Sequence, residues 1–321
     1  MVRYALLFPG QASQQVGMGA DFTRTSPAAR ALFEIADRET KLPLSRVIAE
    51  GPLEQLTDTR FAQPAVVAAS LASLRVLREQ LDCLAIGPPT FCAGHSVGEL
   101  AALAPASGAD ELTILKLVAA RAQLMAECCE RVDGTMAAVV GLAEPNVAAL
   151  CRQARDTTGQ IVEIANLNAP EQIVVSGHRH AVDWLHEAAP LHGARWVIPL
   201  KVGGPFHSSY MRPAAEAFAA RLAEADLRSP DLPIVLNQTG RATRDVHEIR
   251  SELSGQITAP VRWADSLQTM FEAGCSLFLE VGPGQVLAGL VRRTLPEARV
   301  LGVSDGTTLQ KTVKTLAEVG A

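Results

Sequence analysis

The strongest chemical signal in the sequence is the Gly-x-Ser-x-Gly motif at residues 94–98, GHSVG. A short apolar stretch at 90–93 precedes it and an Ala- and Leu-rich stretch at 97–103 follows it, which predicts a strand, a tight turn and a helix. Such a turn lifts the serine hydroxyl out of the backbone and points the N-terminus of the helix at it. The motif therefore predicts that Ser96 attacks an acyl carbon; an ordinary Gly-Ser turn is the alternative.

A serine hydroxyl needs a base to act as a nucleophile, and the chain has seven histidines. We expect His207 to be the base, because it follows the break at 203–205 (GGP), where the chain is predicted to pass between domains. Small-molecule sites form at such junctions. A buried histidine without a catalytic role is the alternative. His95 lies inside the turn and is expected to shape it. The other histidines lie in polar stretches: His178, His180, His186, His192 and His247.

A second loop, residues 9–14, follows the first predicted strand at 3–8. The loops at the carboxyl ends of parallel strands share one edge of a sheet, so we expect this loop to lie beside Ser96. Gln11 and the backbone N–H of Val97 could then donate hydrogen bonds to a developing oxyanion. A turn with solvated glutamines is the alternative.

Arg121 stands in an apolar helical stretch at 115–125, LKLVAARAQLM. An arginine among apolar neighbours rarely stays unpaired. It therefore either meets an internal carboxylate such as Glu99 or binds an anionic ligand, for which its planar fork suits a carboxylate.

The elements that must position these residues are predicted from apolar periodicity and from breaks at Gly and Pro. Residues 1–130 and 205–321 alternate strands and helices and predict a discontinuous α/β domain. Residues 131–204 read β-α-β-β-α-β, with strands at 135–142, 161–167, 172–176 and 195–202, which is the ferredoxin-like order. The prediction is thus a large α/β domain interrupted by a small α+β domain.

Composition restricts the possible function classes. The chain has 321 residues with 48% hydrophobic and 20% charged residues, which excludes intrinsic disorder. The net charge of −5 argues against nucleic-acid binding. No stretch reaches the roughly 18 apolar residues of a membrane span. The six cysteines form no Cys-x-x-Cys pair, which predicts buried, reduced thiols, no metal site and a cytoplasmic protein.

With these motifs the chain resembles the malonyl-CoA:acyl carrier protein transacylases of fatty-acid synthesis. It equally resembles the free-standing acyltransferases that serve polyketide synthases, and the sequence does not separate the two pathways. The motifs of the resemblance run through nearly the whole chain in order: FPGQASQQVGMG at 8–19, GHSVGEL at 94–100, RAQLM at 121–125, ANLNAPEQIVVSG at 165–177, PFHSSYMRPA at 205–214, GQITAPVRW at 255–263 and EVGPGQVLAGL at 280–290.

The resemblance implies an α/β-hydrolase-like large domain with a parallel sheet core and an inserted ferredoxin-like small domain. It implies that Ser96 is acylated, that His207 is its base, and that the main-chain carbonyl of Gln256 orients the histidine. The remaining implied roles are an oxyanion hole formed by Gln11 and Val97, a grip on the malonyl carboxylate by Arg121, and further substrate contacts by Phe206, Asn168 and His95.

The implied reaction is ping-pong transfer of malonyl from malonyl-CoA to the phosphopantetheine thiol of acyl carrier protein, without a cofactor and by a monomer. Phe206 favours malonyl, because in related acyltransferases a bulky residue before the histidine fills the space of an α-methyl group. An acidic carrier requires a local basic patch, for which the candidates are Arg292, Arg293, Lys201 and Arg212; solvated surface residues without a docking role are the alternative. The alternatives are a serine hydrolase of acyl thioesters, an acyltransferase with another acyl preference and a non-catalytic acyl-binding subunit.

One departure from the resemblance concerns the first loop. It has Gly-Gln-Ala where many members of the family have Gly-Gln-Gly, so Ala12 places a Cβ where a positive φ is expected.

Overall fold

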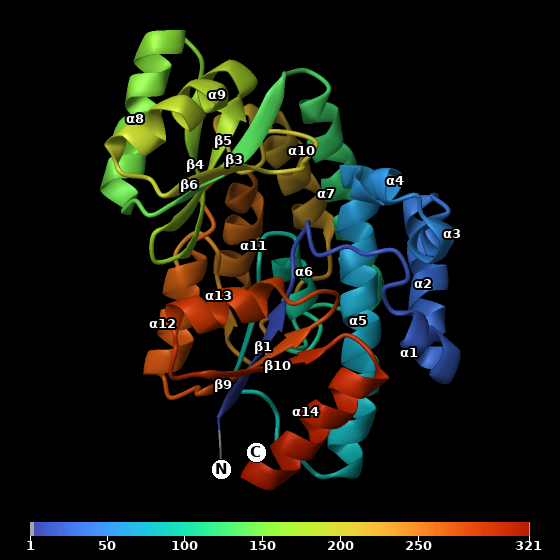
Figure 1. Cartoon of the computed structure of the whole chain (residues 1–321). Helices are drawn as coiled ribbons and strands as arrows, with labels where there is room; N and C mark the ends of the chain where they lie inside the picture. The colour runs from blue at the N-terminus through green and yellow to red at the C-terminus, as the bar shows by residue number, and fades with distance from the viewer. Residues whose placement is uncertain (1–2, 321) are drawn as a thin grey trace.

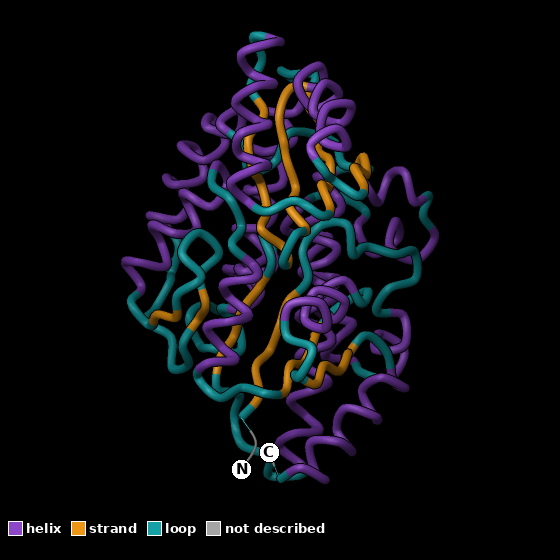
Figure 2. Tube along the Cα trace, turned by 60° about the vertical axis from the view of Figure 1, so that its left-hand side comes forward, coloured by secondary structure: helices purple, strands orange, loops and turns teal. Residues whose placement is uncertain are grey.

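The computed structural model describes residues 3–320 and contains two separate sheets. A six-stranded sheet lies in the lower half of Figure 1 and a four-stranded sheet in the upper half. In Figure 2 the strands of both sheets occupy the centre of the molecule, with helices around them. The α/β class predicted from the sequence is confirmed.

The six-stranded sheet, called sheet A, is mostly parallel. Its order is β10 (Arg299–Val303), β9 (Leu277–Val281), β1 (Tyr4–Phe8), β2 (Phe91–Gly94), β7 (Ile234–Val235) and β8 (Ala242–Thr243). Every neighbouring pair is parallel except β7 and β8. All five residues of β1 are buried, and alternate side chains enter different clusters, which is why the sequence reads as a continuous apolar run.

Helices cover both faces of sheet A. Leu6 and Phe8 of β1 pack into the larger core, and Ala5 and Leu7 into the smaller one. The helices that contribute to the larger core are α1 (Ala20–Thr25), α2 (Pro27–Thr40), α3 (Leu44–Glu50), α4 (Leu53–Thr57), α5 (Thr59–Cys83), α6 (Gly98–Ala102), α7 (Glu111–Cys129), α10 (Arg212–Glu224), α11 (Val246–Gly255) and α14 (Gly306–Val319). The helices of the smaller core are α12 (Trp263–Glu272) and α13 (Val286–Thr294).

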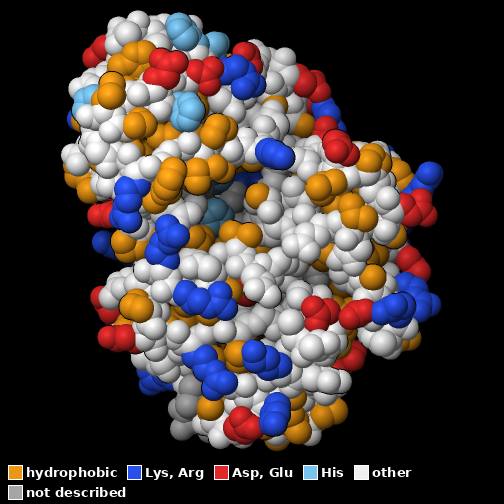
Figure 3. All heavy atoms as spheres, viewed as in Figure 1, with side chains coloured by type: hydrophobic (Ala, Val, Ile, Leu, Met, Phe, Trp, Pro, Cys, Tyr) orange, Lys and Arg blue, Asp and Glu red, His pale blue; other side chains and the backbone are white. Residues whose placement is uncertain are grey.

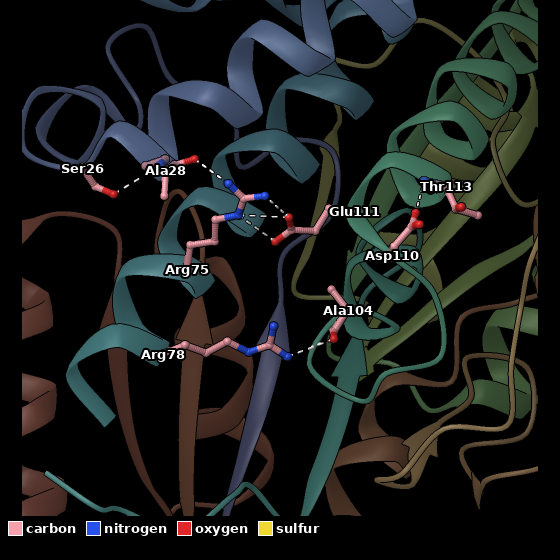
Figure 4. A network of polar contacts seen from close by, with 9 residues as sticks. Ser26, Ala28, Arg75, Arg78, Ala104, Asp110, Glu111 and Thr113 are labelled. Atoms are coloured by element: carbon pink, nitrogen blue, oxygen red, sulfur yellow. Dashed lines mark hydrogen bonds and ion pairs between the residues drawn. The ribbon is translucent and has the colours of Figure 1, made fainter. Parts of the chain in front are cut away.

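Two arginines of α5 tie this helical layer together (Figure 4). Arg75 pairs with Glu111 at the start of α7 and donates a hydrogen bond of 2.7 Å to the carbonyl of Ala28 in α2. Arg78 donates to the carbonyl of Ala104, in the turns that follow α6, at 2.9 Å. These bonds fix α7, which carries Arg121, against α5.

The four-stranded sheet, called sheet B, is antiparallel. Its order is β4 (Val162–Ala169), β5 (Gln172–His178), β3 (Gly134–Val140) and β6 (Trp196–Pro199). Side chains on one face, such as Val139 and Val175, form a separate core with α8 (Glu144–Thr158) and α9 (Arg179–Ala188). Side chains on the other face, such as Ala138 and Val174, join the larger core. One face of sheet B is therefore turned toward the part of the chain that carries sheet A.

The chain passes to sheet B and returns through two segments that touch each other. A Cβ atom on Gly134 would lie 2.3 Å from Cδ of Pro205, and one on Gly204 would lie 2.1 Å from Sγ of Cys129. A side chain at either glycine would collide with the Pro205 ring or the Cys129 side chain, so the outgoing and the returning segments pack closely here.

Some sequence expectations need correction. The predicted strand at 195–202 is limited to Trp196–Pro199, because the following residues turn toward the cleft. The polar stretch around His247 is not only surface, since it begins helix α11 (Val246–Gly255), whose Ile249 is buried. The cysteines are all free, but Cys83 is exposed rather than buried. Within residues 3–320, no helix is both long and apolar enough to cross a bilayer.

Candidate active site

Ser96 stands at the turn between β2 and α6, as the motif predicts, and its backbone is left-handed with φ 52°. The strain is on the serine itself, while the flanking glycines are needed for close packing. A Cβ on Gly94 would lie 2.0 Å from the backbone of Gly98, and a Cβ on Gly98 would lie 2.3 Å from the carbonyl of Phe8. The two glycines therefore let the turn pack onto itself and onto β1, which leaves the serine at the carboxyl edge of sheet A.

The structure brings His207 to Ser96 from 111 residues further along the chain. Nε2 of His207 lies 2.7 Å from Oγ of Ser96, and Nδ1 lies 2.8 Å from the main-chain carbonyl of Gln256. A carbonyl only accepts hydrogen bonds, so Nδ1 carries the proton and Nε2 is free to accept one from the serine. Burial, together with the nearby Arg121 guanidinium, lowers the pKa of His207 to about 3, so the ring is neutral at ordinary pH.

Arg121 is 2% exposed, and its guanidinium points at the serine. Nη1 donates to Oε1 of Gln63 at 2.7 Å. Nη2 donates to Oε1 of Gln256 at 2.9 Å and to Oγ of Ser96 at 3.2 Å. Burial lowers the pKa of Arg121 to about 10, against an opposing effect of Glu99, so the group stays cationic. A buried cation held mainly by neutral amides beside a nucleophile is suited to an anionic ligand.

Glu99 is the internal carboxylate that the sequence offered as a partner for Arg121, but the two side chains are linked through an amide. Nε2 of Gln256 donates to Glu99, while Oε1 of the same amide accepts from Arg121. Burial, with a further contribution from Glu252, raises the pKa of Glu99 well above its ordinary value. Gln256 thus serves the site twice, with its carbonyl on His207 and its side chain on Arg121.

Ser96, His207 and Gln63 line a cavity of about 240 Å³ between the two sheets, and Arg121 lies behind it, in contact with Oγ of Ser96. Gln11, Ser96 and His207 line it on one side, and Ala138, Val174 and Leu200 on the side of sheet B. Figure 3 shows the surface hollowed between the upper and lower parts of the molecule. The cavity is mainly apolar around a few polar groups, as ligand sites generally are.

The remaining predicted substrate contacts also line this cavity. Nε2 of His95 lies 2.8 Å from Oδ1 of Asn168, and the His95 ring meets Trp263 edge-on with ring centroids 5.3 Å apart. Asn168, on β4, therefore connects sheet B to the serine turn. Phe206 is 6% exposed and also lines the cavity.

The first loop adopts the predicted strained form. Ala12 has φ 81°, and its N–H donates to Oε1 of Gln14 at 2.7 Å. Gln11 beside it lines the cavity, and its side chain lies 3.4 Å from Oγ1 of Thr59. Within residues 3–320, neither the N–H of Gln11 nor that of Val97 donates to another protein group. Gln11 lines the cavity and Val97 directly follows Ser96, which also lines it, so both N–H groups lie beside the space that a bound oxygen atom would occupy.

The basic residues proposed from the sequence lie on both sides of the cavity. Arg292 and Arg293 are exposed in the last turn of α13, whose Val286, Leu287 and Leu290 line the cavity. Lys201 is exposed between Leu200 and Val202, which line it from the other side, and Arg212 is exposed at the start of α10.

Sequence reasoning missed two buried residues of the site, Gln63 and Asn237. Both lack a motif, but each left a weak signal. Gln63 directly precedes the predicted apolar helix at 64–80, and Asn237 is the last residue of a predicted strand at 234–237. Their exposures of 1% and 0% come from tertiary packing that the local sequence does not encode.

A serine paired with a neutral histidine, beside available N–H donors, forms the kind of site that transfers acyl groups. Comparison with known proteins agrees with this class. The family model described as "Acyl transferase domain" matches residues 5–319. The chain therefore belongs to the acyl transferase family.

The similar proteins match this chain over nearly its whole length. The malonyl CoA-acyl carrier protein transacylase of Bacillus subtilis is 37% identical over 321 residues, covering 99% of this chain and 98% of that protein. The same-named protein of Escherichia coli K12 is 36% identical and covers 91% and 93%. Among solved structures, the transacylase of Coxiella burnetii has a TM-score of 0.92 at 34% identity, covering 98% of both chains. A malonyl-transacylase in complex with a type II polyketide acyl-carrier protein has the same score and identity, covering 98% and 99%.

Proposed function

We propose that this protein transfers a malonyl group from malonyl-CoA to the phosphopantetheine thiol of an acyl carrier protein, through a malonyl ester on Ser96. The observation that carries the proposal is Arg121, a buried cation 3.2 Å from a serine that also meets a neutral histidine. A hydrolase or transferase of uncharged acyl groups has no need of such a cation. The full-length relatives named as malonyl CoA-acyl carrier protein transacylases support the same substrate.

In the first half-reaction His207 takes the proton of the Ser96 hydroxyl as Oγ attacks the thioester carbonyl. The negative oxygen of the tetrahedral intermediate accepts hydrogen bonds from the N–H groups of Gln11 and Val97. The carbon–sulfur bond then breaks, and the CoA thiolate takes the proton from His207. The main-chain carbonyl of Gln256 holds the ring in the required tautomer throughout.

In the second half-reaction the carrier's thiol gives its proton to His207 and attacks the malonyl ester. The carbon–oxygen bond breaks, and Ser96 recovers its proton from the imidazolium. Each half-reaction therefore begins and ends with a neutral histidine and needs no cofactor.

Arg121 binds the free carboxylate of the malonyl group. That carboxylate carbon is three bonds from the serine oxygen, so a guanidinium within hydrogen-bond distance of Oγ is placed to meet it. Ser96 accepts only one of the three hydrogen bonds of the guanidinium, so a carboxylate that accepts in place of Oγ leaves the bonds to Gln63 and Gln256 intact. The grip also orients the ester toward the entering thiol and away from water.

The same proposal includes the domain architecture, the oligomeric state and the cellular compartment. The order β4-β5-β3-β6 with two helices on one face supports a ferredoxin-like small domain at 131–204, inserted into an α/β-hydrolase-like domain at 1–130 and 205–321. A monomer is proposed because one chain supplies every group of the site. The six free cysteines support a reducing compartment such as the cytoplasm.

The test is intact-protein mass spectrometry after incubation with malonyl-CoA, followed by addition of holo acyl carrier protein. We expect one malonyl group on the protein, located on Ser96, which then moves to the carrier. The Ser96→Ala variant should form no adduct. Release of free malonate without carrier would identify a hydrolase, and wild-type transfer by the Ser96→Ala variant would overturn the scheme.

A further inference from the structure

Asn237 is a fully buried residue, 0% exposed, that makes four hydrogen bonds around the serine turn. Its side-chain Oδ1 accepts the backbone N–H of Ser96 at 2.7 Å, and its Nδ2 donates to the carbonyl of Gly94 at 2.7 Å. Its own N–H donates to Oε1 of Glu99 at 3.1 Å, and its carbonyl accepts the N–H of Arg262 at 2.7 Å. The side chain thus spans the strained turn, and the backbone is held from both directions.

The reason for this arrangement lies in the sheet. β2 and β7 pair in parallel through Cys92 with Ile234 and Ala93 with Val235. The pairing ends after these residues, because β2 turns into α6 while the segment after β7 continues to Asn237. The carbonyl of Gly94 and the N–H of Ser96 then lack a backbone partner in the ladder. The Asn237 amide takes that place for both groups.

Only a side chain whose terminal group has both a hydrogen-bond acceptor and a donor can bond to the N–H of Ser96 and the carbonyl of Gly94 together. A primary amide does so at every pH, an ionised carboxylate only accepts, and an alkyl side chain does neither. The position therefore requires an amide, because a side chain of the same size without both a donor and an acceptor leaves one of the two backbone groups unpaired.

We propose that Asn237 is a positioning residue that holds Ser96 in its left-handed conformation and so aims Oγ at the cavity. The inference rests on the proposed function insofar as Ser96 is the nucleophile. A non-glycine residue at φ 52° persists only where its surroundings hold it there. Without the two amide bonds the turn relaxes, and Oγ leaves its 2.7 Å contact with His207.

Asn237→Asp tests this with a side chain of nearly equal shape. A protonated carboxyl accepts from Ser96 and donates to Gly94, whereas an ionised one places a negative oxygen against the Gly94 carbonyl. The charged groups packed around the position are the carboxyls of Glu99 and Glu252, Arg121 beyond Gln256, and Arg262, whose guanidinium pairs with Asp265. Burial and the two glutamates raise the pKa of a carboxyl placed there.

The measured quantity is the rate at which Ser96 reacts with a fluorophosphonate probe and, separately, with malonyl-CoA, from about pH 5 to about pH 9. We expect the ratio of N237D to wild type to be near one at acidic pH. The ratio should then fall about tenfold per pH unit above the pKa of the new carboxyl. Dividing by the wild-type rate removes the pH dependence that the two proteins share, including that of the probe.

The matched control is Gln238→Glu, which adds the same carboxyl one residue further along. Gln238 bonds to Glu252 and does not contact the serine turn. Its ratio to wild type should not change with pH. A flat ratio for N237D, high or low, would overturn the proposal, and so would an equal slope in the control.

If N237D fails to fold, two further measurements still test the proposal. Asn237→Ala, checked by circular dichroism, should slow the labelling of Ser96 at least tenfold without weakening malonyl-CoA binding. In the unaltered protein the Ser96 amide should be protected from hydrogen exchange, and rapid exchange would contradict the clamp. Because the fluorophosphonate reads serine reactivity without malonyl, failure of malonyl transfer and failure of the clamp are distinguishable.

Discussion

Replacing Arg121 by methionine separates recognition of the malonyl carboxylate from the chemistry at Ser96. Methionine keeps the length and apolar packing of the arginine stem and removes only the cation. Glu99, the nearby carboxyl, already has a raised pKa, so it can stay neutral when the cation is gone. We therefore expect the variant to fold, with Gln63 and Gln256 free to bond with each other or with water.

The magnitude follows from the bonds that the carboxylate would lose. A charge-assisted hydrogen bond is worth about 1.5–3 kcal/mol, and loss of one partner of a buried ion pair costs about 3–5 kcal/mol. At about 1.4 kcal/mol per factor of ten, malonyl transfer should fall by roughly two to four powers of ten in kcat/KM. Acetyl transfer makes no bond to a carboxylate and should fall far less, because there only the Arg121 contact with Oγ of Ser96 is lost. The malonyl-to-acetyl ratio should thus fall at least about 100-fold.

The assay is competition between malonyl-CoA and acetyl-CoA for one carrier protein, read by the mass of the loaded carrier. The matched control is Arg78→Met, which removes a half-buried arginine whose hydrogen bond goes to Ala104 (Figure 4). This control should lower the melting temperature and leave the acyl ratio unchanged. An R121M ratio within about threefold of wild type would refute the carboxylate grip, since that spread corresponds to less than 1 kcal/mol.

The other predictions concern the base, the acyl pocket and the carrier. Because the pKa of His207 is lowered to about 3, the base stays unprotonated as pH falls from neutral. The acylation rate of Ser96 should therefore hold between about pH 8 and about pH 5, and a tenfold loss per unit below about pH 6.5 would contradict this assignment. Phe206→Ser should admit methylmalonyl-CoA, shifting selectivity by about 1–3 kcal/mol in competition assays; continued exclusion would show that other side chains set the pocket size. Reversing the charge of Arg292 and Arg293 should raise KM for an acidic carrier and leave acylation by malonyl-CoA intact; an unchanged KM would place the dock elsewhere.

Many of the strands and turns that carry the site could be predicted from the sequence, because each depends on a few neighbouring residues. The buried run of β1, the break after it and the Gly-x-Ser-x-Gly turn each lie within a few residues, and their meaning depends on backbone sterics. The positive φ of Ala12 was also predicted, because that expectation depends on the residue type at a single position of the first loop. The helices α11, α13 and α14 were not predicted: α11 begins in a charged stretch, and α13 is only nine residues long and follows the Gly-Pro-Gly break at 282–284.

The partners of Arg121 could not be predicted for a different reason. Its bonds reach Gln63 and Gln256, which stand 58 and 135 residues away in the chain. Sequence reasoning left a choice between Glu99 and an external anion, and the structure places an amide between the arginine and that glutamate. Only the packing of α5, α7 and the turn after α11 decides which side chains meet.

The contact between the two connecting segments has a consequence for motion. A hinge motion would have to bend both connecting segments at once, and here Gly134 lies against the Pro205 ring and Gly204 against the Cys129 side chain, where a Cβ atom would collide. The part of the chain that carries sheet B is thus braced at the point where a hinge would act. A change in the width of the cleft would then require both segments to move together, so the two contacts couple the position of sheet B to the site that receives the coenzyme and the carrier's arm.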